Sequence, residues 1–532
     1  MALVRNPILP GFHPDPSICR VGEWYYIASS TFEWWPGVRL HRSRDLASWE
    51  LVGHALTRRS QLDMRGNPDS GGVWAPCLTH ADGLFWLVYT DAKSLQGPFK
   101  DLRNYLVTAP AIEGPWSEPV ALNASGFDPS LFHAPDGRKW IVAMDWRVRT
   151  DVSAFGGISL QEYSVATGRL VGRPRIIFPG SELGITEGPH LYFRDGWHWL
   201  VTAEGGTGWN HAVSVARSRA IAGPYELAPN HPLLSSAGDP GNPLQKAGHG
   251  SLVETPEGRW YLVHLCSRPT APNRRCILGR ETALQALEWP AGEWPRLAGG
   301  GNRPLLEVEV PEAAVARPYL RLFEDNFTAP LPGPHWNSLR EPLGEPWLSL
   351  TERPGHLRLR GRHSLQSAFD QSSLGFRLLH PSCTVSTRLD FHPADHHQQA
   401  GLALFYNSSN FYYLHLSADA SGLRELRLLA CDNRRHREVL EFPIQVPGNG
   451  PVGLSASLVG ERLVFQADFG EGPVRVGPVL DAGILSDDHP IDAGIAWAFT
   501  GTFAVLCAQD SADSAIPADF DHFRYEAHQE QP

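Results

Sequence analysis

Short apolar runs, each introduced by a glycine and aromatic residues, recur through the first 300 residues. One example is Gly22-Glu23-Trp24-Tyr25-Tyr26-Ile27, and similar runs begin at Gly83, Gly137, Gly196 and Gly258. A turn residue followed by aromatic and β-branched residues is typical of a β-hairpin. The five glycines are 61, 54, 59 and 62 residues apart, so one unit recurs five times. Units long enough to hold four strands, repeated in this way, predict a five-bladed β-propeller.

The pattern changes after a glycine-rich stretch at 298–302 and a predicted linker at 310–314. From Leu320 onward, shorter alternating segments recur, for example at 356–360, 401–406 and 411–416. Short strands separated by turn residues indicate a β-sandwich. Helical periodicity is almost absent. We therefore predict an all-β protein with a propeller domain over residues 1–310 and a sandwich domain over residues 320–532.

Three of the repeated units carry an acidic residue just before the apolar hairpin. Asp15 and Asp128 each lie in Asp-Pro-Ser, and Glu187 lies in Thr-Glu-Gly-Pro-His. We interpret the segment before each glycine as the innermost strand of its blade. The three acids should then occupy matching places and meet at one end of the central channel. The glycine- and tryptophan-bearing loops at 145–157 and 204–210 are expected to wall that pocket.

Converging carboxylates suit the hydrolysis of a glycosidic bond. One carboxylic acid protonates the leaving oxygen, and a second carboxylate activates water or attacks the anomeric carbon. A third carboxylate can raise the pKa of the acid by like-charge repulsion. Taken alone, each Asp-Pro-Ser is more often a turn whose aspartate accepts hydrogen bonds from local backbone N–H groups. Its recurrence at the same place in two units favours a site.

The amino-acid composition bears on which molecules the protein binds and on where it is located. The 18 tryptophans are numerous, and their rings can stack on sugar faces, although most are expected to pack in the propeller. The net charge of −11 argues against a nucleic-acid partner. No signal peptide or membrane-spanning run is recognised. The seven scattered cysteines suggest neither zinc nor a disulfide framework, which favours the cytoplasm.

Four further residues are candidates for binding the sugar, each with an alternative role. His249 could ligate a metal, hold a water in the channel or be an ordinary buried histidine. Arg280 could fork onto two sugar hydroxyls or pair with the adjacent Glu281. Phe32 and Trp74 could line the pocket or simply pack in the core.

Taken together, the motifs identify a family. The sequence resembles, over its full length, the inverting β-xylosidases and α-L-arabinofuranosidases of glycoside hydrolase family 43. The resemblance is carried by Asn6–Phe12, Pro14–Ser17, Ser29–Trp34, Gly72–Pro76, Phe127–Ser130, Thr186–His190, Gly248–Ser251 and Leu278–Ala283.

This resemblance implies a five-bladed propeller followed by a concanavalin-like sandwich, and it implies roles for single residues. Asp15 would be the general base, Glu187 the general acid and Asp128 the residue that tunes and orients the acid. Phe32, Trp74, His249 and Arg280 would bind the sugar. Phe503, within Phe499–Phe503, would be a lid from the second domain, although it could equally be an ordinary sandwich residue.

Some implications of the resemblance are less direct. His13 stands where many such β-xylosidases have asparagine, so fine substrate preference is open. Catalysis should need no cofactor. Some relatives bind calcium in the sandwich, and Asp325 and Asp521 could supply ligands here, or could be solvated turn acids. Relatives are often homodimers or homotetramers.

The predicted function is therefore an exo-acting, inverting β-xylosidase that releases xylose from the non-reducing end of β-1,4-xylo-oligosaccharides. The nearest alternative is an α-L-arabinofuranosidase or an enzyme with both activities. A non-catalytic sugar-binding propeller is more remote, since a lectin needs no tuned acid. A family-32-like fructosidase is set aside, because its Asn-Asp-Pro-Asn and Arg-Asp-Pro signatures are missing from the sequence.

Overall fold

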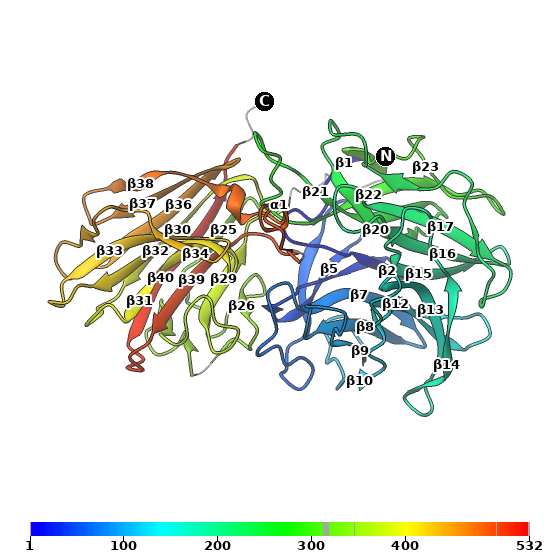
Figure 1. Ribbon diagram of the computed structural model, residues 1–532, viewed down its shortest axis with the longest axis horizontal. Coiled ribbons are helices and arrows are strands. Elements are labelled where there is room, and N and C mark those ends of the chain that lie inside the picture. Colours follow the sequence, from blue (N-terminus) through cyan, green and yellow to red (C-terminus); the bar gives the residue numbers. More distant parts are fainter. Residues whose placement is uncertain (1, 312–318, 345, 496, 530–532) are drawn as a thin grey trace. The chain divides into compact units, whose positions relative to one another are not determined.

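A computed structural model describes residues 2–311, 319–344, 346–495 and 497–529. The chain forms two compact units, Met1–Arg268 with Arg280–Tyr319, and Pro269–Gly279 with Leu320–Pro532. In Figure 1 the first unit holds the strands from β1 to β24 and the second those from β25 to β40. Most of the predicted linker at 310–314 lies outside the described residues.

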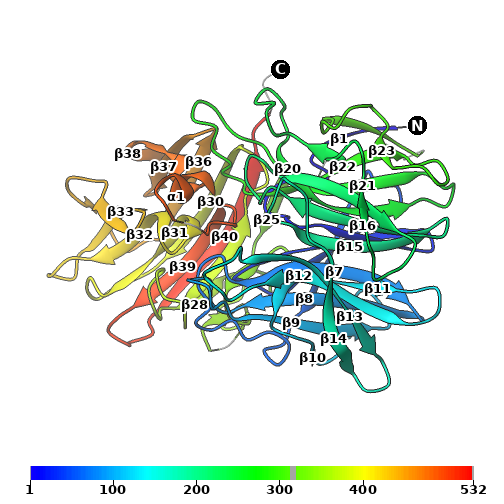
Figure 2. The same ribbon diagram turned by 45° about the vertical axis from the view of Figure 1, so that its right-hand side comes forward.

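The first unit contains five antiparallel blade sheets in sequence order, four of them four-stranded and one with an added fifth strand, which confirms the predicted five-bladed propeller. Figure 2 shows one of them, β7 to β10, in blue. The sheets are β2 (Ser17–Val21), β3 (Trp24–Ser29), β5 (Gly37–Ser43) and β6 (Glu50–Leu56); β7 (Gly72–Ala81), β8 (Leu84–Ala92), β9 (Leu102–Ala109) and β10 (Val120–Ala121); β11 (Gly126–His133), β12 (Lys139–Trp146), β13 (Phe155–Ser164) and β14 (Arg169–Phe178); β15 (Glu187–Arg194), β16 (Trp197–Glu204), β17 (Ala212–Ser218) and β18 (Glu226–Leu227), with β19 (Leu234–Ser235) beside β17; and β20 (Gln245–Glu254), β21 (Trp260–Ser267), β22 (Glu281–Glu288) and β23 (Arg296–Leu297).

The first strand of each blade is the innermost one. β2, β7, β11, β15 and β20 contact one another in turn around the propeller axis. Each of these strands leads through a tight turn into the second strand, and the glycines found in the sequence, such as Gly22 and Gly83, occupy those turns with positive φ. Glycine adopts this backbone conformation without steric cost. The hairpin pattern therefore also specified which strand faces the axis.

The ends of the first unit pair with each other. β1 (Ala2–Arg5) runs antiparallel to β24 (Glu307–Val310), with Val4 opposite Val308. Both valines are buried in one core with residues of the first and fifth blades. This two-stranded ribbon joins the N-terminal strand to the last strand of the unit and packs against the first and fifth blades. A short strand, β4 (Trp34–Trp35), also belongs to this unit.

The second unit is a sandwich of two antiparallel sheets, as predicted. One sheet has the order β27 (Leu348–Ser349), β28 (Leu357–Arg360), β40 (Pro517–Ala527), β30 (Ser382–Asp390), β36 (Val452–Val459), β37 (Arg462–Asp468) and β38 (Pro473–Asp481), with β25 (Leu322–Asp325) beside β40. The other has the order β34 (Arg435–Glu438), β33 (Arg424–Asp432), β32 (Asn410–Ala418), β31 (Gln398–Asn407), β39 (Phe503–Asp510), β29 (Ser372–Arg377) and β26 (Asn337–Leu339), with β35 (Ile444–Gln445) beside β33. A 3-10 turn, η1 (Ala482–Leu485), and the five-residue α1 (Asp488–Asp492) are the helical elements of the described residues.

Segment Pro269–Gly279 comes from the middle of the chain but folds with the second unit. The buried carboxylate of Glu461 accepts hydrogen bonds from Asn273 N (3.0 Å) and Asn273 Nδ2 (2.7 Å). The backbone N–H of Cys276 donates to Asp488 Oδ2 at 3.0 Å. The sequence pattern placed this segment within the propeller domain, because nothing in its local periodicity reveals these partners.

Candidate active site

A backbone irregularity recurs at the start of the inner strands. Asp15, Ala75, Asp128 and His249 all have φ between +31° and +53°, a conformation that residues with a Cβ rarely adopt. In β7, β11 and β20 the pairing register shifts at this residue, which marks a β-bulge. Bulges re-aim side chains and are common near active sites. Asp15 precedes β2, where no bulge occurs, but it shares the backbone conformation of Asp128, and both lie at the start of an inner strand.

Glu187 does not occupy the matching position, contrary to the sequence-based expectation. In the fourth blade the residue with positive φ before the proline is Gly188, and Glu187 precedes it by one residue. A Cβ on Gly188 would lie 2.9 Å from His249 Cε1, so only glycine fits there. The carboxylate is therefore supplied from the preceding position. Glu187 keeps some exposed surface as a residue, while its carboxyl group is covered.

Asp15 is held as a buried carboxylate by three neighbours. Ser30 Oγ donates to Asp15 Oδ2 at 2.6 Å, Arg280 Nη1 donates to Oδ1 at 3.2 Å, and His249 Nδ1 lies 3.8 Å from Oδ1. Burial alone would raise the pKa of Asp15, but the positive charge of Arg280 and the Ser30 hydrogen bond, with the nearby imidazole of His249, outweigh it. The pKa of Asp15 is therefore lowered, and the group stays ionised.

Asp128 and Glu187 form a coupled pair with the opposite tendency. Burial raises the pKa of both carboxyls. The negative charge of Asp15 raises the pKa of Asp128 further, and the charges of Asp128 and Asp15 raise that of Glu187. Gly188 N donates to Asp128 Oδ2 at 3.0 Å, a bond that favours the ionised form of Asp128. Both carboxyls therefore favour the protonated form more than an isolated acid does, and the Gly188 bond lessens this tendency for Asp128.

Arg280 belongs to this cluster. Its Nη1 reaches both Asp15 and Thr207 Oγ1 (2.9 Å), and its Cζ lies 5.2 Å from the centroid of the Phe32 ring. The alternative partner, Glu281, is instead bound by both Arg268 Nε and Nη2 at 2.7 Å. Because Arg268 satisfies Glu281, the two adjacent charges point to different partners, and Arg280 is available at the acidic site.

Phe32 and Trp74 lie next to each other beside these charges. The two segments are joined by the hydrogen bonds Phe32 N to Val73 O and Val73 N to Phe32 O, and the ring centroids are 6.2 Å apart. Trp74 in turn contacts Phe127 edge to face at 5.4 Å, next to Asp128 in the sequence. Trp146 and Phe155 continue this aromatic row within loop 145–157. Such rings offer apolar faces to a sugar.

The histidines of this end are neutral. Burial lowers the pKa of His249, and it lowers the pKa of His211 to about 3. His13 is turned elsewhere. Its Nδ1 lies 2.9 Å from Pro10 O, and its ring packs against His41 and Tyr319. The backbone N–H of His13 donates to Arg280 O at 2.9 Å, so His13 is linked to the site through its backbone.

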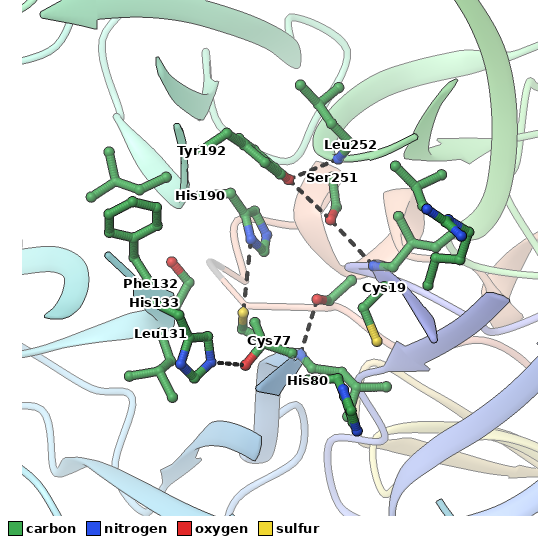
Figure 3. Close-up of a pocket in the computed structure, with 18 of the residues that line it drawn as sticks. Cys19, Cys77, His80, Leu131, Phe132, His133, His190, Tyr192, Ser251 and Leu252 are labelled. Atoms are coloured by element: carbon green, nitrogen blue, oxygen red, sulfur yellow. Dashed lines mark hydrogen bonds between the residues drawn. The ribbon is translucent and has the colours of Figure 1, made fainter. Parts of the chain in front are cut away.

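The other end of the axis holds a separate cavity of about 360 Å³, lined by the continuations of the five inner strands. Figure 3 shows His190 and Cys77 pointing toward each other there, with Tyr192 directed at Ser251. The distances are 3.9 Å from Cys77 Sγ to His190 Nδ1 and 3.3 Å between the two hydroxyl oxygens. These residues come from the later parts of the inner strands, whereas Asp15 and Asp128 lie at the start of theirs.

Three candidates from the second unit are placed as follows. Phe503 begins β39 and is buried, with Arg377 Cζ 5.5 Å from its ring centroid. Asp325 accepts hydrogen bonds from Phe327 N and Trp336 Nε1, both at 2.8 Å. Asp521 Oδ1 lies 2.5 Å from His522 Nδ1. Among the described residues, Asp325 and Asp521 belong to no group of three clustered ligand side chains, so calcium stays a prediction.

Two residues that contact the candidate site were not singled out from the sequence. Ser30 bridges Asp15 and Ala75 N, its hydroxyl accepting from the latter at 2.7 Å, and Thr207 binds Arg280. Ser30 lies in the Ser-Ser-Thr-Phe motif, and Thr207 lies in loop 204–210. Their hydroxyls are common in loops, and only the approach of another segment reveals their partners.

Among the described residues, no helix has the length and apolar character that a membrane span needs.

This end of the propeller can carry out acid–base chemistry. It combines one carboxyl whose pKa is lowered with two whose pKa values are raised, beside an arginine and aromatic rings. Two carboxyl groups with opposite protonation preferences are what hydrolysis of a glycosidic bond requires.

Comparisons with known proteins agree with this chemistry. Residues 4–295 match the model of glycosyl hydrolases family 43, and residues 324–526 match that of the beta xylosidase C-terminal concanavalin A-like domain. The chain is 49% identical to xylosidase/arabinosidase 43B of Humicola insolens, over 99% of this chain and 98% of that protein. It is 45% identical to a beta-xylosidase of Bacillus subtilis, strain 168, over 98% and 99%.

A solved structure is similar over the same extent. The crystal structure of a xylan beta-1,4-xylosidase from Bacillus halodurans C-125 superposes with a TM-score of 0.95 at 48% identity, covering 98% of this chain and all of that one. Propeller, acidic site and both family models thus agree, and the chain belongs to glycosyl hydrolase family 43.

Proposed function

We propose that this protein is an exo-acting β-xylosidase that removes xylose from the non-reducing end of β-1,4-xylo-oligosaccharides with inversion. The observation that carries the proposal is the group Asp15, Asp128 and Glu187, one acid ionised and one protonated, at one end of a propeller axis. The names of the full-length relatives, which include xylosidases, support the substrate class.

In the proposed mechanism, Asp15 accepts a proton from the water that attacks the anomeric carbon. Glu187 gives its proton to the leaving oxygen as the glycosidic bond breaks. One proton enters Asp15 and one leaves Glu187, so the enzyme regains its starting state by a net transfer of one proton through solvent. Asp128 stays ionised, and its negative charge keeps Glu187 protonated until the proton passes to the leaving oxygen.

The sugar itself would be held by Arg280, Phe32, Trp74 and His249. A guanidinium carries five N–H donors, and Arg280, which already contacts Asp15 and Thr207, would bind sugar hydroxyls through this group. Phe32 and Trp74 would stack on the ring. The lid role of Phe503, calcium at Asp325 and Asp521, assembly into dimers or tetramers and a cytoplasmic location stay predictions.

An α-L-arabinofuranosidase activity in the same site is the second candidate. It is favoured by the relative from Humicola insolens, whose name includes both activities. A xylopyranose and an arabinofuranose present similar hydroxyl geometry, so one pocket can accept both. Turnover of the two nitrophenyl glycosides separates the cases. We expect kcat/KM on the β-D-xyloside to be the larger.

The proposal is tested by proton NMR of β-1,4-xylobiose during hydrolysis. We expect α-xylose to appear first, before mutarotation, because water attacks from the face opposite the leaving group. Early β-xylose would mean that a carboxylate acts as nucleophile and would overturn the assigned roles. Stable xylobiose together with hydrolysis of an α-L-arabinofuranoside would replace the proposed function by the second candidate. Binding of xylobiose with hydrolysis of neither would favour the non-catalytic binder.

A change at Asp128 should move the pH profile in a defined direction. Asp128→Asn removes a negative charge that raises the pKa of Glu187. The pKa of Glu187 should therefore fall, and Glu187 should lose its proton at lower pH. We expect the alkaline limb of kcat/KM to shift toward acid by about 1 pH unit, which corresponds to roughly 1.4 kcal/mol. An unchanged or more alkaline limb would contradict the role of Asp128.

A further inference from the structure

Glu204, at the end of β16, is a buried carboxylate outside the group of three acids, and it is fully covered. It accepts four hydrogen bonds from neutral donors. Oε1 receives Ser181 N and Thr186 Oγ1, both at 2.9 Å, and Oε2 receives Ser181 Oγ at 2.5 Å and Ser214 Oγ at 2.8 Å. Three of these four bonds go to the segment that immediately precedes Glu187.

That segment contains a tight and strained turn. Gly184 and Ile185 have φ of +69° and +50°, and Ile185 is β-branched, a residue type that rarely adopts positive φ. Such a conformation persists only where the surroundings hold it in place. Oε1 of Glu204 bridges the two sides of this turn, since Ser181 lies before it and Thr186 after it.

The packing around the carboxylate is close. A Cβ on Gly180 would lie 2.0 Å from Thr186 Oγ1, so glycine is required for the segment to fold against Glu204. Gly205 N, the next residue after Glu204, donates to Gly184 O at 2.8 Å inside the turn. Two residues further on, Thr207 accepts from Arg280. Glu204 therefore joins the segment that ends in Glu187 to the loop that contacts Arg280.

We propose that Glu204 is a positioning residue, which sets the place of the Glu187 carboxyl by clamping the turn 181–186 and ties it to the Thr207 loop. Glu204 touches none of the three acids through the hydrogen bonds above and acts through the backbone. The inference rests on the proposed function, because it concerns the acid of that reaction. It predicts that loss of the Glu204 hydrogen bonds lowers kcat most for substrates whose leaving group must be protonated.

The test compares two substrates, xylobiose, whose leaving group needs a proton, and 2,4-dinitrophenyl β-D-xyloside, whose leaving group does not. Glu204→Ala should lower kcat on xylobiose by about 10²-fold, as expected for displacement of a catalytic group, with a much smaller loss on the aryl xyloside. Glu204→Gln can accept from Ser181 N through its carbonyl and donate to the hydroxyls. It should recover most of the lost activity on xylobiose.

Two milder variants serve if Glu204→Ala does not fold. Thr186→Val keeps the shape of the side chain and removes the bond on the turn, and we expect a loss of about 10-fold on xylobiose but not on the aryl xyloside. Ser214→Ala removes a bond to the same carboxylate from β17, away from the turn. This matched control should leave the ratio of the two activities unchanged.

Equal losses on both substrates in Glu204→Ala and Thr186→Val, or a changed ratio in Ser214→Ala alone, would overturn the positioning role. Wild-type protein that hydrolyses neither xyloside would instead overturn the proposed function, and the inference with it. Wild-type activity together with a strong leaving-group dependence in Glu187→Gln, but not in the clamp variants, would reject only the role of Glu204.

Discussion

Replacing Asp15 by alanine should reduce kcat on xylobiose by about 10²- to 10⁴-fold, the usual contribution of a general base, while KM changes little. Asp15 acts on the attacking water, so its contribution is made in the transition state and not in substrate binding. The lowered pKa of Asp15 keeps it ionised and ready to accept a proton throughout the neutral range. Steady-state kinetics on xylobiose, with substrate binding measured calorimetrically, checks both parts.

A second aspartate of the same blade provides a matched control. Asp45 Oδ1 accepts hydrogen bonds from Ser43 Oγ, Ala47 N and Ser48 N in a turn of the first blade. Asp45→Ala removes a carboxylate with a similar number of partners but without a role at the acids, and kcat should stay within a factor of about 3. Turnover close to wild type in Asp15→Ala would remove Asp15 from the mechanism, and equal losses in both variants would indicate a folding defect.

The second large effect is expected at Glu187. Glu187→Gln should lower kcat on xylobiose by about 10²- to 10⁴-fold, because the glutamine amide cannot protonate the leaving oxygen. On 2,4-dinitrophenyl β-D-xyloside the loss should be far smaller, since that leaving group departs as an anion. The alkaline limb of the pH profile, which follows the raised pKa of Glu187, should disappear in the variant.

Glu182 offers the corresponding control on the same segment. It is exposed, and its Oε1 lies 2.9 Å from His231 Nε2. Glu182→Gln removes one negative charge five residues before Glu187 and should affect both substrates equally and slightly. If Glu187→Gln lost the same factor on xylobiose and on the aryl xyloside, protonation would not be the step that Glu187 serves, and another acid would have to be sought.

Several features of the site were predictable because they are properties of a repeat. The recurring glycine and aromatic run identified five hairpins, and the strand before each glycine proved to be the innermost strand. That register alone was enough to bring Asp15, Asp128 and His249 to one end of the axis. The alternating strands after Leu320 likewise identified the sandwich, since the period of a half-buried strand is visible in the sequence.

Other features depend on contacts between distant segments. Whether Arg280 binds sugar hydroxyls or pairs with Glu281 was open in the sequence. In the structure Arg268 binds Glu281, and Arg280 contacts Asp15 instead. The one-residue offset of Glu187 follows from the close approach of His249 to Gly188. Segment Pro269–Gly279 of the second unit shows no periodic pattern in the sequence. Its place depends on hydrogen bonds to Glu461 and Asp488, which lie 188 and 212 residues from their partners in the chain.

Local sequence thus determined the class of fold, the number of blades and the three carboxylates, because hairpin periodicity and turn chemistry act over a few residues. The relative pKa values of these acids depend on the tertiary structure. They depend on burial, on the Gly188 N–H at Asp128 and on the charges of Arg280 and Asp15, which come from separate blades. A pKa is set by the field of everything near the group, and folding alone brings these neighbours together.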